Sequence, residues 1–197
     1  MRVLSLLFLL SLAAFVYFRN AAAQPIARPP GVLCPLAPLQ SVQDLPPAFE
    51  HKGYRIEPLA RFALEARVLG KRLYRYDRGA SLAPLDLVLG WGRMSDSRVL
   101  EKISISQSNR FYFWYTANSP IPLEEIALSS ANMHMIPATE DLERRLKQLR
   151  IGNIVRLRGY LVRVSGSDGF YWQSSLTRSD TGNGACELVW VEELAVR

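Results

Sequence analysis

The side chains that build metal centres and nucleophilic sites are scarce in this chain. It has two cysteines, Cys34 and Cys186, and two histidines, His51 and His134, among 197 residues. A structural zinc site needs about four ligands, usually arranged in close pairs such as C-x-x-C, and these four residues lie far apart in the sequence. We therefore predict no metal site and no cofactor.

Motifs typical of nucleophilic enzymes are lacking as well. The G-x-S-x-G turn that presents a catalytic serine does not occur in the sequence. No local signature of a catalytic cysteine surrounds either thiol. Internal repeats and low-complexity tracts are also absent, which excludes a repeat array and favours one globular domain.

Long hydrophobic runs are confined to the amino terminus. An uncharged stretch, Val3–Phe18, is 16 residues long and falls short of the roughly 20 residues that cross a bilayer untilted. Alanines at 21–23 supply a cleavage site that would leave Gln24 as the mature amino terminus, whereas Arg19 is typical of the outer end of an anchor. We predict that residues 1–23 are a signal peptide or a short membrane anchor, with the protein in the periplasm or on the outer face of the inner membrane.

The next segment, residues 24–50, contains seven of the 12 prolines. Because proline fixes φ and has no N–H donor, we predict an extended, semi-rigid linker. The alternative is an arm packed on the domain, since apolar residues such as Val32, Leu33 and Leu36 would gain from burial. Residues 51–197 have the length of a single β-rich domain.

The chain is modestly basic, with a formal net charge of +6. If Arg2 and Arg19 leave with a signal peptide, 22 basic residues remain against 18 acidic ones. This balance favours anionic partners such as an anionic glycan or acidic lipid headgroups. We do not expect nucleic acid as a partner, because an exported protein rarely meets it.

Export also gives the two cysteines a possible role. Cysteine pairs in exported proteins commonly form disulfides. We predict that Cys34 and Cys186 are a candidate bridge between the proline-rich segment and the carboxyl-terminal strand.

Most of the domain alternates apolar and polar residues with a period of two, which is typical of half-buried strands. The strands predicted in this way cover residues 61–68, 110–116, 130–136, 153–164, 170–175 and 186–191. The spacing becomes helical between Thr139, a plausible N-cap, and Gly152, a plausible end. Two shorter helices are expected, one over residues 96–103 and one that begins at Pro122. The sequence thus predicts a mostly β domain with one main helix.

The order of these elements resembles the OB-fold, a small Greek-key barrel whose helix lies between its third and fourth strands. The resemblance covers roughly residues 59–191 and includes the G-x-x-V-x-L-x-G run from Gly152 to Gly159. It implies a β-barrel-like sheet. It implies no particular function, because such barrels host unrelated ligands.

A second resemblance rests on three short segments, which are Gly90–Ser95, Ile105–Ser108 and Ser130–His134. They are similar to segments of an uncharacterised family of small exported or membrane-anchored bacterial proteins. The resemblance implies a compartment and no activity.

Aromatic and basic residues interleave in two segments, Arg110–Tyr115 and Arg156–Tyr160. Surfaces that stack on sugars or on single-stranded nucleic acid use this combination. A hydroxyl-rich stretch, Ser174–Cys186, could bind an anion through Arg178 and its backbone amides, although it is equally typical of a turn. The candidate ligand-binding residues are Arg156, Arg158, Tyr160 and Arg178.

Two functions of different classes remain open at this point. The first is a non-catalytic binding or assembly module of the bacterial cell envelope, with an envelope protein or an anionic glycan as ligand. The alternative is a hydrolase or transferase that uses His134 with Cys186 or a serine. The missing catalytic motifs favour the first function.

Overall fold

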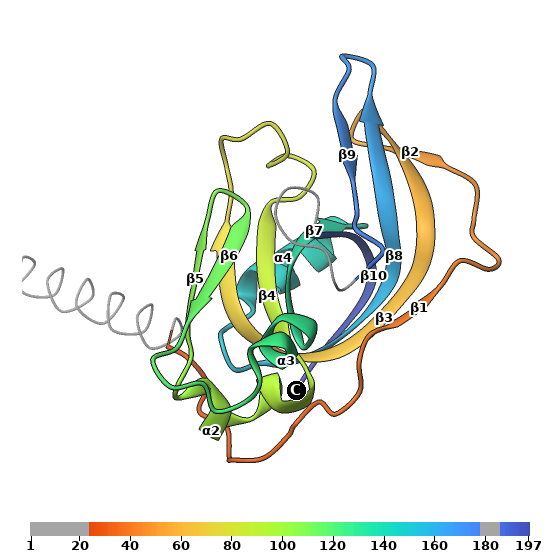
Figure 1. The fold of residues 1–197 in the computed structure, drawn as a ribbon. Coiled ribbons are helices and arrows are strands. Elements are labelled where there is room, and N and C mark those ends of the chain that lie inside the picture. Colours follow the sequence, from red (N-terminus) through yellow and green to blue (C-terminus); the bar gives the residue numbers. More distant parts are fainter. Residues whose placement is uncertain (1–23, 178–185) are drawn as a thin grey trace, which may run out of the picture.

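The computed structural model describes residues 24–177 and 186–197, and within these residues the protein is mostly β (Figure 1). Five strands form a closed cycle in which each strand pairs with the next. Around the cycle, the strands are β3 (Tyr54–Leu73), β4 (Leu85–Gly90), β7 (Ser130–Pro137), β10 (Glu187–Val196) and β8 (Ile154–Gly166). The cycle closes because β8 also pairs with β3. The mostly β class predicted from the sequence is confirmed.

Most neighbours in this barrel are antiparallel, and β7 and β10 are parallel. A parallel pair needs a long crossover, which here contains helix α4 (Glu140–Gln148) and strand β8. The helix therefore lies between the third and fourth barrel strands along the chain. The sequence also predicted three strands before it, but it counted residues 110–116, which lie outside the barrel, in place of β4. Membership of the OB-fold stays a prediction.

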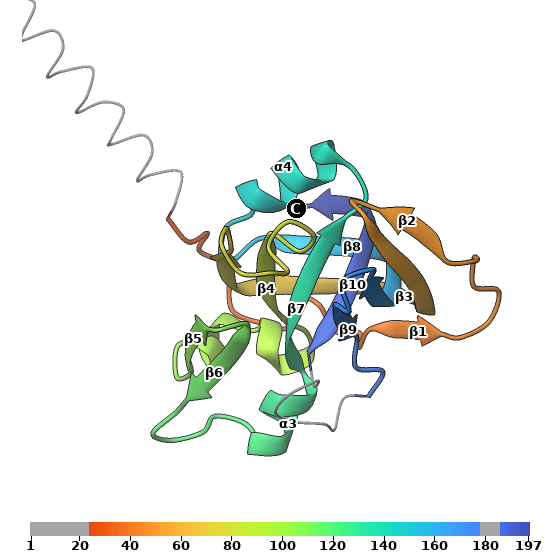
Figure 2. The same cartoon turned by 90° about the horizontal axis from the view of Figure 1, so that it is seen from above.

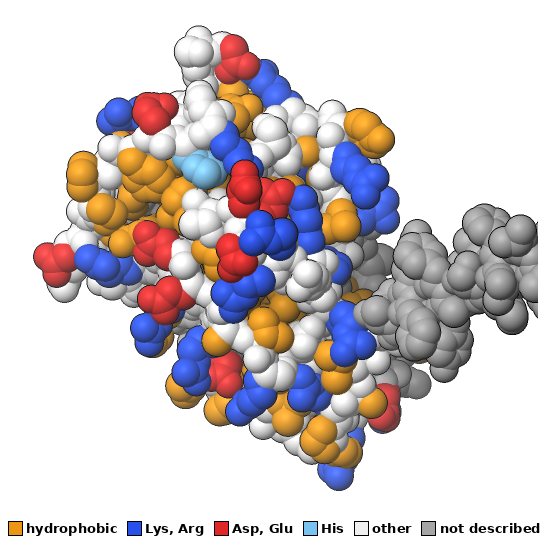
Figure 3. Space-filling model, turned by 180° about the vertical axis from the view of Figure 1, so that it is seen from behind, with side chains coloured by type: hydrophobic (Ala, Val, Ile, Leu, Met, Phe, Trp, Pro, Cys, Tyr) orange, Lys and Arg blue, Asp and Glu red, His pale blue; other side chains and the backbone are white. Residues whose placement is uncertain are grey.

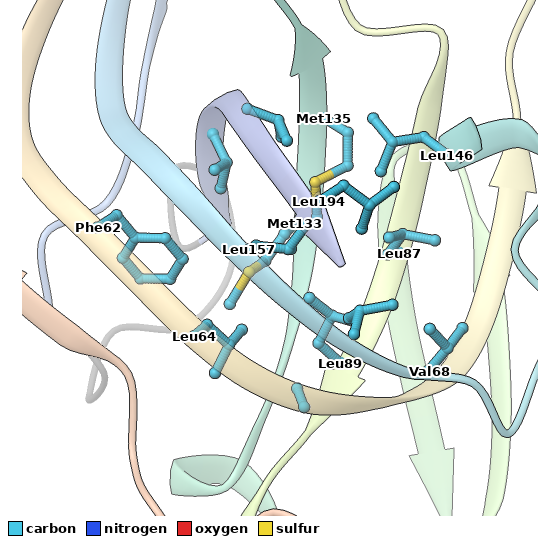
Figure 4. Packing of buried hydrophobic residues seen from close by; sticks show 14 of the residues in the cluster. Phe62, Leu64, Val68, Leu87, Leu89, Met133, Met135, Leu146, Leu157 and Leu194 are labelled. Atoms are coloured by element: carbon cyan, nitrogen blue, oxygen red, sulfur yellow. The ribbon is translucent and has the colours of Figure 1, made fainter. Parts of the chain in front are cut away.

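The interior of the barrel is filled by every second side chain of its strands, together with the apolar side of α4. Figure 4 shows Phe62 and Leu64 from β3, Leu87 and Leu89 from β4, and Met133 and Met135 from β7 converging on this interior. All six are at most 3% exposed. The strand residues between them face outward, and they build the outer surfaces of the barrel.

Helix α4 begins where the sequence predicted and ends earlier. The hydroxyl of Thr139 accepts a hydrogen bond from the amide of Leu142 at 3.2 Å, which is an N-cap. The last helical residue is Gln148 rather than a position next to Gly152. Gly152 instead has φ +91°, and a Cβ there would overlap the backbone of Ile26 in the amino-terminal arm.

A long connection between β4 and β7 folds as a separate layer. It contains a 3-10 helix η1 (Gly92–Ser95), helix α2 (Ser97–Leu100), the hairpin of β5 (Ser104–Ser108) and β6 (Phe111–Tyr115), and helix α3 (Leu123–Leu128). A cluster that includes Val88, Met94 and Ile126 packs this layer against the outside of the barrel. Both short helices were predicted, although α2 ends at Leu100 rather than near Ile103.

Residues 24–50 lie along the barrel, so they are a packed arm rather than the expected linker. The amide of Ile26 donates to the carbonyl of Ile151 at 2.8 Å, and the guanidinium of Arg28 donates to Gly152 O at 2.7 Å. Farther on, β1 (Leu39–Ser41) and β2 (Phe49–His51) both pair with β3. Figure 1 shows the orange arm passing beneath the barrel and up its side. The side chain of Cys34 is fully buried in the core.

The predicted disulfide is not formed. Cys34 and Cys186 both keep the thiol form and do not lie at disulfide distance. The reason is that the sheet separates them, because Cys34 belongs to the interior cluster while the Cys186 sulfur lies near Asn132 on the outer face. Among the described helices none is long and apolar enough to cross a membrane, and residues 1–23 lie outside the described part.

The short strand β9 (Tyr171–Gln173) pairs with the end of β8. Figure 1 shows this hairpin projecting beyond the barrel, and Figure 2 looks down on it from above. It places Trp172 over the outer face of β7, with its ring centroid 4.7 Å from that of His134.

Candidate functional site

The predicted binding residues of β8 project outward at alternate positions. Arg156 and Arg158 are exposed, and Tyr160 is partly buried. Arg156 forms an ion pair with Glu65 at 2.9 Å, and Arg158 forms a longer one with Glu193 at 3.6 Å. Arg178 lies outside the described residues.

Two of these residues share a groove. Arg158 and Tyr160 line a surface groove of about 510 Å³. Its other polar lining residues are Gln40, Ser41, Arg61, Glu192 and Glu193. Arg156 lies in a separate hollow of about 190 Å³ with Glu65 and Arg197. The structure thus brings Arg158 and Tyr160 together and leaves Arg156 apart.

One wall of the groove is fixed by the amino-terminal arm. The guanidinium of Arg61 lies 5.9 Å from the centre of the Tyr160 ring, at the outer limit of a cation–π contact. The same group donates hydrogen bonds to the backbone carbonyls of Gln43 and Asp44. The contacts of Arg61 therefore hold both Tyr160 and the segment that follows β1.

The opposite wall comes from an irregularity in β10. Its register with β8 shifts between Val191 and Glu193, which is the signature of a β-bulge. Across from it, Gly159 has φ +158°, and a Cβ there would overlap the carbonyl of Trp190. Glycine at this position allows the close backbone approach that sets Glu192 and Glu193 along the groove.

The charges of the groove are loosely paired. The side chains of Arg158 and Glu193 are 62% and 67% exposed, so their ion pair contributes little to stability and both can turn toward a partner. Basic and acidic side chains are also interspersed over the face seen in Figure 3. The groove can therefore bind a ligand that has both signs of charge.

A second polar centre lies on the outside of β4 and β7. Asp86 is fully buried, and one of its carboxylate oxygens lies 2.9 Å from Nδ1 of His134 and 2.8 Å from the guanidinium of Arg110. The amide of Asn132 is 3.4 Å from the other oxygen. A buried carboxylate in this position is compensated by a cation and by hydrogen bonds.

Arg110 is the cation that joins this centre to the β5–β6 hairpin. Residues Asn109 and Arg110 form the two-residue turn, with φ of +49° and +68°. Such turns favour glycine at the second position, but arginine stands there and makes contacts that glycine could not. Its guanidinium contacts Asp77 at 2.8 Å and lies 3.7 Å from the ring centre of Tyr74. Burial, followed by the charge of Asp86, raises the pKa of the Tyr74 hydroxyl.

The two candidate catalytic residues reach this centre by different routes, since Cys186 contacts Asn132 while His134 lies directly beside Asp86. The side-chain amide of Asn132 is 3.9 Å from the sulfur of Cys186 and donates to the carbonyl of Arg110 at 2.9 Å. His134 is 4% exposed and has the ring of Trp172 against it. Arg110 neutralises Asp86, while Nδ1 of His134 lies close to the carboxylate without the geometry of a hydrogen bond.

Sequence reasoning missed Asp86, Asp77 and the anchoring role of Arg110. The signal for Asp86 was its place in an otherwise apolar run, Leu85–Gly90, where a lone carboxylate indicates a buried ionic partner.

Within residues 24–177 and 186–197, no group of three or more His, Cys, Asp or Glu side chains is arranged to hold a metal ion. Comparisons of the chain found no matching family model, no similar curated protein and no similar solved structure.

Proposed function

We propose that this protein is a non-catalytic binding or assembly module of the bacterial cell envelope, and that it binds a polypeptide segment in the groove between β1, β3, β8 and β10. The observation that supports this most is the groove itself, where Arg158, Tyr160 and Glu193 lie together. The leucine-rich segment at residues 1–23 supports export as a prediction from sequence.

A polypeptide fits the groove better than an anionic glycan. Basic Arg158 and acidic Glu193 lie in the same groove, so a purely anionic ligand would meet repulsion as well as attraction. A polypeptide can present an acid to one and a base to the other. The ring of Tyr160 offers an apolar contact beside a polar hydroxyl, a combination that is frequent at protein interfaces.

The test is a photo-crosslinking residue placed at Gln40, in the groove, in the mature protein expressed in its own envelope. We expect a crosslinked polypeptide that disappears with Arg158→Ala or Tyr160→Ala. Arg156→Ala is the matched control, because Arg156 is an exposed arginine on the same strand but outside the groove. The same crosslinker at Tyr76, which is 95% exposed on a distant loop, should not capture that species.

Two results would contradict the proposal. One is a captured species that is unaffected by Arg158→Ala and Tyr160→Ala. The other is loss of the crosslink upon addition of a purified anionic envelope polysaccharide that itself binds the groove. That outcome would assign the groove to a glycan.

A hydrolase or transferase that uses His134 with Cys186 or a serine is the second candidate, and one observation favours it. Nδ1 of His134 lies 2.9 Å from the carboxylate of Asp86, and acid–base histidines commonly have a carboxylate beside this nitrogen. It predicts that Cys186 alkylates faster than an ordinary thiol at neutral pH and that His134→Ala abolishes the difference. Equal alkylation rates of Cys186 in the wild type and in His134→Ala would exclude an enzyme that uses Cys186 as its nucleophile.

A further inference from the structure

The β5–β6 hairpin has two faces of different chemistry. Ile105, Tyr112 and Trp114 pack inward on the cluster that joins the hairpin to the barrel. In an antiparallel pair, directly opposed residues share a face, and the register opposes Ser104 to Tyr115, Ser106 to Phe113 and Ser108 to Phe111. We call the outward set of these residues the aromatic–serine face. It consists of Ser104, Ser106, Ser108, Phe111, Phe113 and Tyr115.

This face leaves large aromatic side chains in water. Phe113 is 56% exposed and Tyr115 is 70% exposed, Phe111 at the start of the row is partly buried, and all three serines are exposed. Alternate residues of a strand are about 7 Å apart, so three rings extend over about 14 Å. Exposed aromatic rings in a row are an unfavourable way to build a surface that has no ligand, because their burial would be worth more than that of most side chains.

The hairpin is held rigidly from its inner side. The guanidinium of Arg110 binds Asp86 and Asp77, the hydroxyl of Tyr112 lies 3.2 Å from Ser130 O, and the amide of Gln107 donates to Asn132 at 2.8 Å. A row of rings fixed in this way binds with little loss of conformational entropy. The anchoring therefore favours a binding role for the outer face.

We infer that the aromatic–serine face binds an uncharged linear oligosaccharide. The face of an aromatic ring is electron-rich and attracts the polarised C–H groups of a sugar ring, and serine hydroxyls both donate and accept hydrogen bonds to sugar hydroxyls. The length of the row requires an oligomer, since one sugar ring cannot contact both Phe111 and Tyr115. This site lies on a sheet separate from the groove, so it is independent of the proposed function.

The charge of the face argues against single-stranded nucleic acid, which also stacks on aromatic rows. Such sites combine the rings with cations that follow the phosphates. All six side chains of the aromatic–serine face are uncharged. Of the neighbouring cations, Arg110 in the turn is directed inward to Asp86 and Asp77, which leaves Lys102 before β5 rather than a row of cations along the rings.

The experiment uses the chain from Gln24 onward and titrates it with a linear oligomer of N-acetylglucosamine and, in parallel, with a linear glucose oligomer. Binding is measured by calorimetry and by changes in tryptophan fluorescence. We expect binding of at least one of them, and at least a tenfold loss of affinity with Phe113→Ala plus Tyr115→Ala. Tyr76→Ala, which removes a 95% exposed aromatic ring elsewhere, is the matched control and should bind like the wild type.

A second pair of variants separates ring stacking from general hydrophobicity. Phe113→Leu keeps an apolar side chain but loses the flat ring, and we expect it to bind at least fivefold more weakly, whereas Tyr115→Phe keeps most of the affinity. Unchanged thermal unfolding of the variants excludes a folding defect. The inference is overturned if neither oligomer binds, if Phe113→Leu binds like the wild type, or if the face binds single-stranded nucleic acid instead.

Discussion

At the scale of single residues, Cys34 shows what burial does to an ionisable group. Its side chain is fully buried in the interior cluster, and this burial, with a smaller effect of Glu65, raises the pKa of the thiol from its ordinary value of 9.0 to about 11. The neutral thiol is therefore the form that folding favours.

A pH dependence of stability follows from this pKa. Below pH 9 the thiol is protonated in both states, and between pH 9 and 11 only the unfolded state loses the proton, so stability falls as pH rises through this window. We expect Cys34 to account for a loss of about 2 to 3 kcal/mol across it. Urea unfolding of the wild type and of Cys34→Ala at several pH values gives the difference between their free energies of unfolding, and this difference should change over the window. A constant difference from pH 9 to 11 would contradict the prediction.

At the scale of elements, the buried network docks the β5–β6 hairpin onto the barrel. Asp86 comes from β4, His134 and Asn132 come from β7, and Arg110 comes from the turn of the hairpin. Arg110 adopts a positive φ where glycine would cost less. Arginine at this position therefore accepts an unfavourable backbone conformation, and its guanidinium joins the two layers.

The two carboxylates that bind Arg110 should differ greatly in their effect. Asp86→Ala leaves Arg110 and His134 without their buried partner, and we expect a loss of about 3 to 5 kcal/mol in the free energy of unfolding. Asp77 is 40% exposed, so Asp77→Ala should cost no more than about 1 kcal/mol. Denaturant unfolding compares the two, and hydrogen exchange should show faster exchange of the β5 and β6 amides in Asp86→Ala. Equal losses would contradict a docking role for the network.

At the scale of the whole molecule, the elements that the sequence predicts are the strands and the helix that bury one face and expose the other. Strands such as β3 and β8 alternate buried and exposed residues along much of their length, and helix α4 has a clear cap, so local pattern was sufficient. Strand β4 was missed because all of its residues are buried, which removes the alternation. Strand β5 was missed because its outward residues are serines, which are typical of loops.

The candidate sites were less predictable than the fold, and for a physical reason. Arg158 and Tyr160 could be found as an alternating outer row, but their groove depends on a bulge in β10 and on the position of β1, which are both distant in sequence. The Asp86 centre likewise joins β4, β7 and a hairpin turn. Long-range pairing of this kind leaves no local pattern to identify it.

The arm is the element whose role differs most from the sequence expectation, and its removal is a direct test. In a chain that begins at Pro35 rather than Gln24, the protein loses the hydrogen bonds that the amides of Ile26 and Leu33 donate and the buried side chain of Cys34. We expect such a chain to lose at least about 3 kcal/mol of stability, measured by urea unfolding. Arg28→Ala in the full mature chain is a milder control that removes one side chain's contacts. A free linker could be removed without effect, so equal stability of the two chains would restore the linker interpretation. A large loss would show that the domain begins near Gln24.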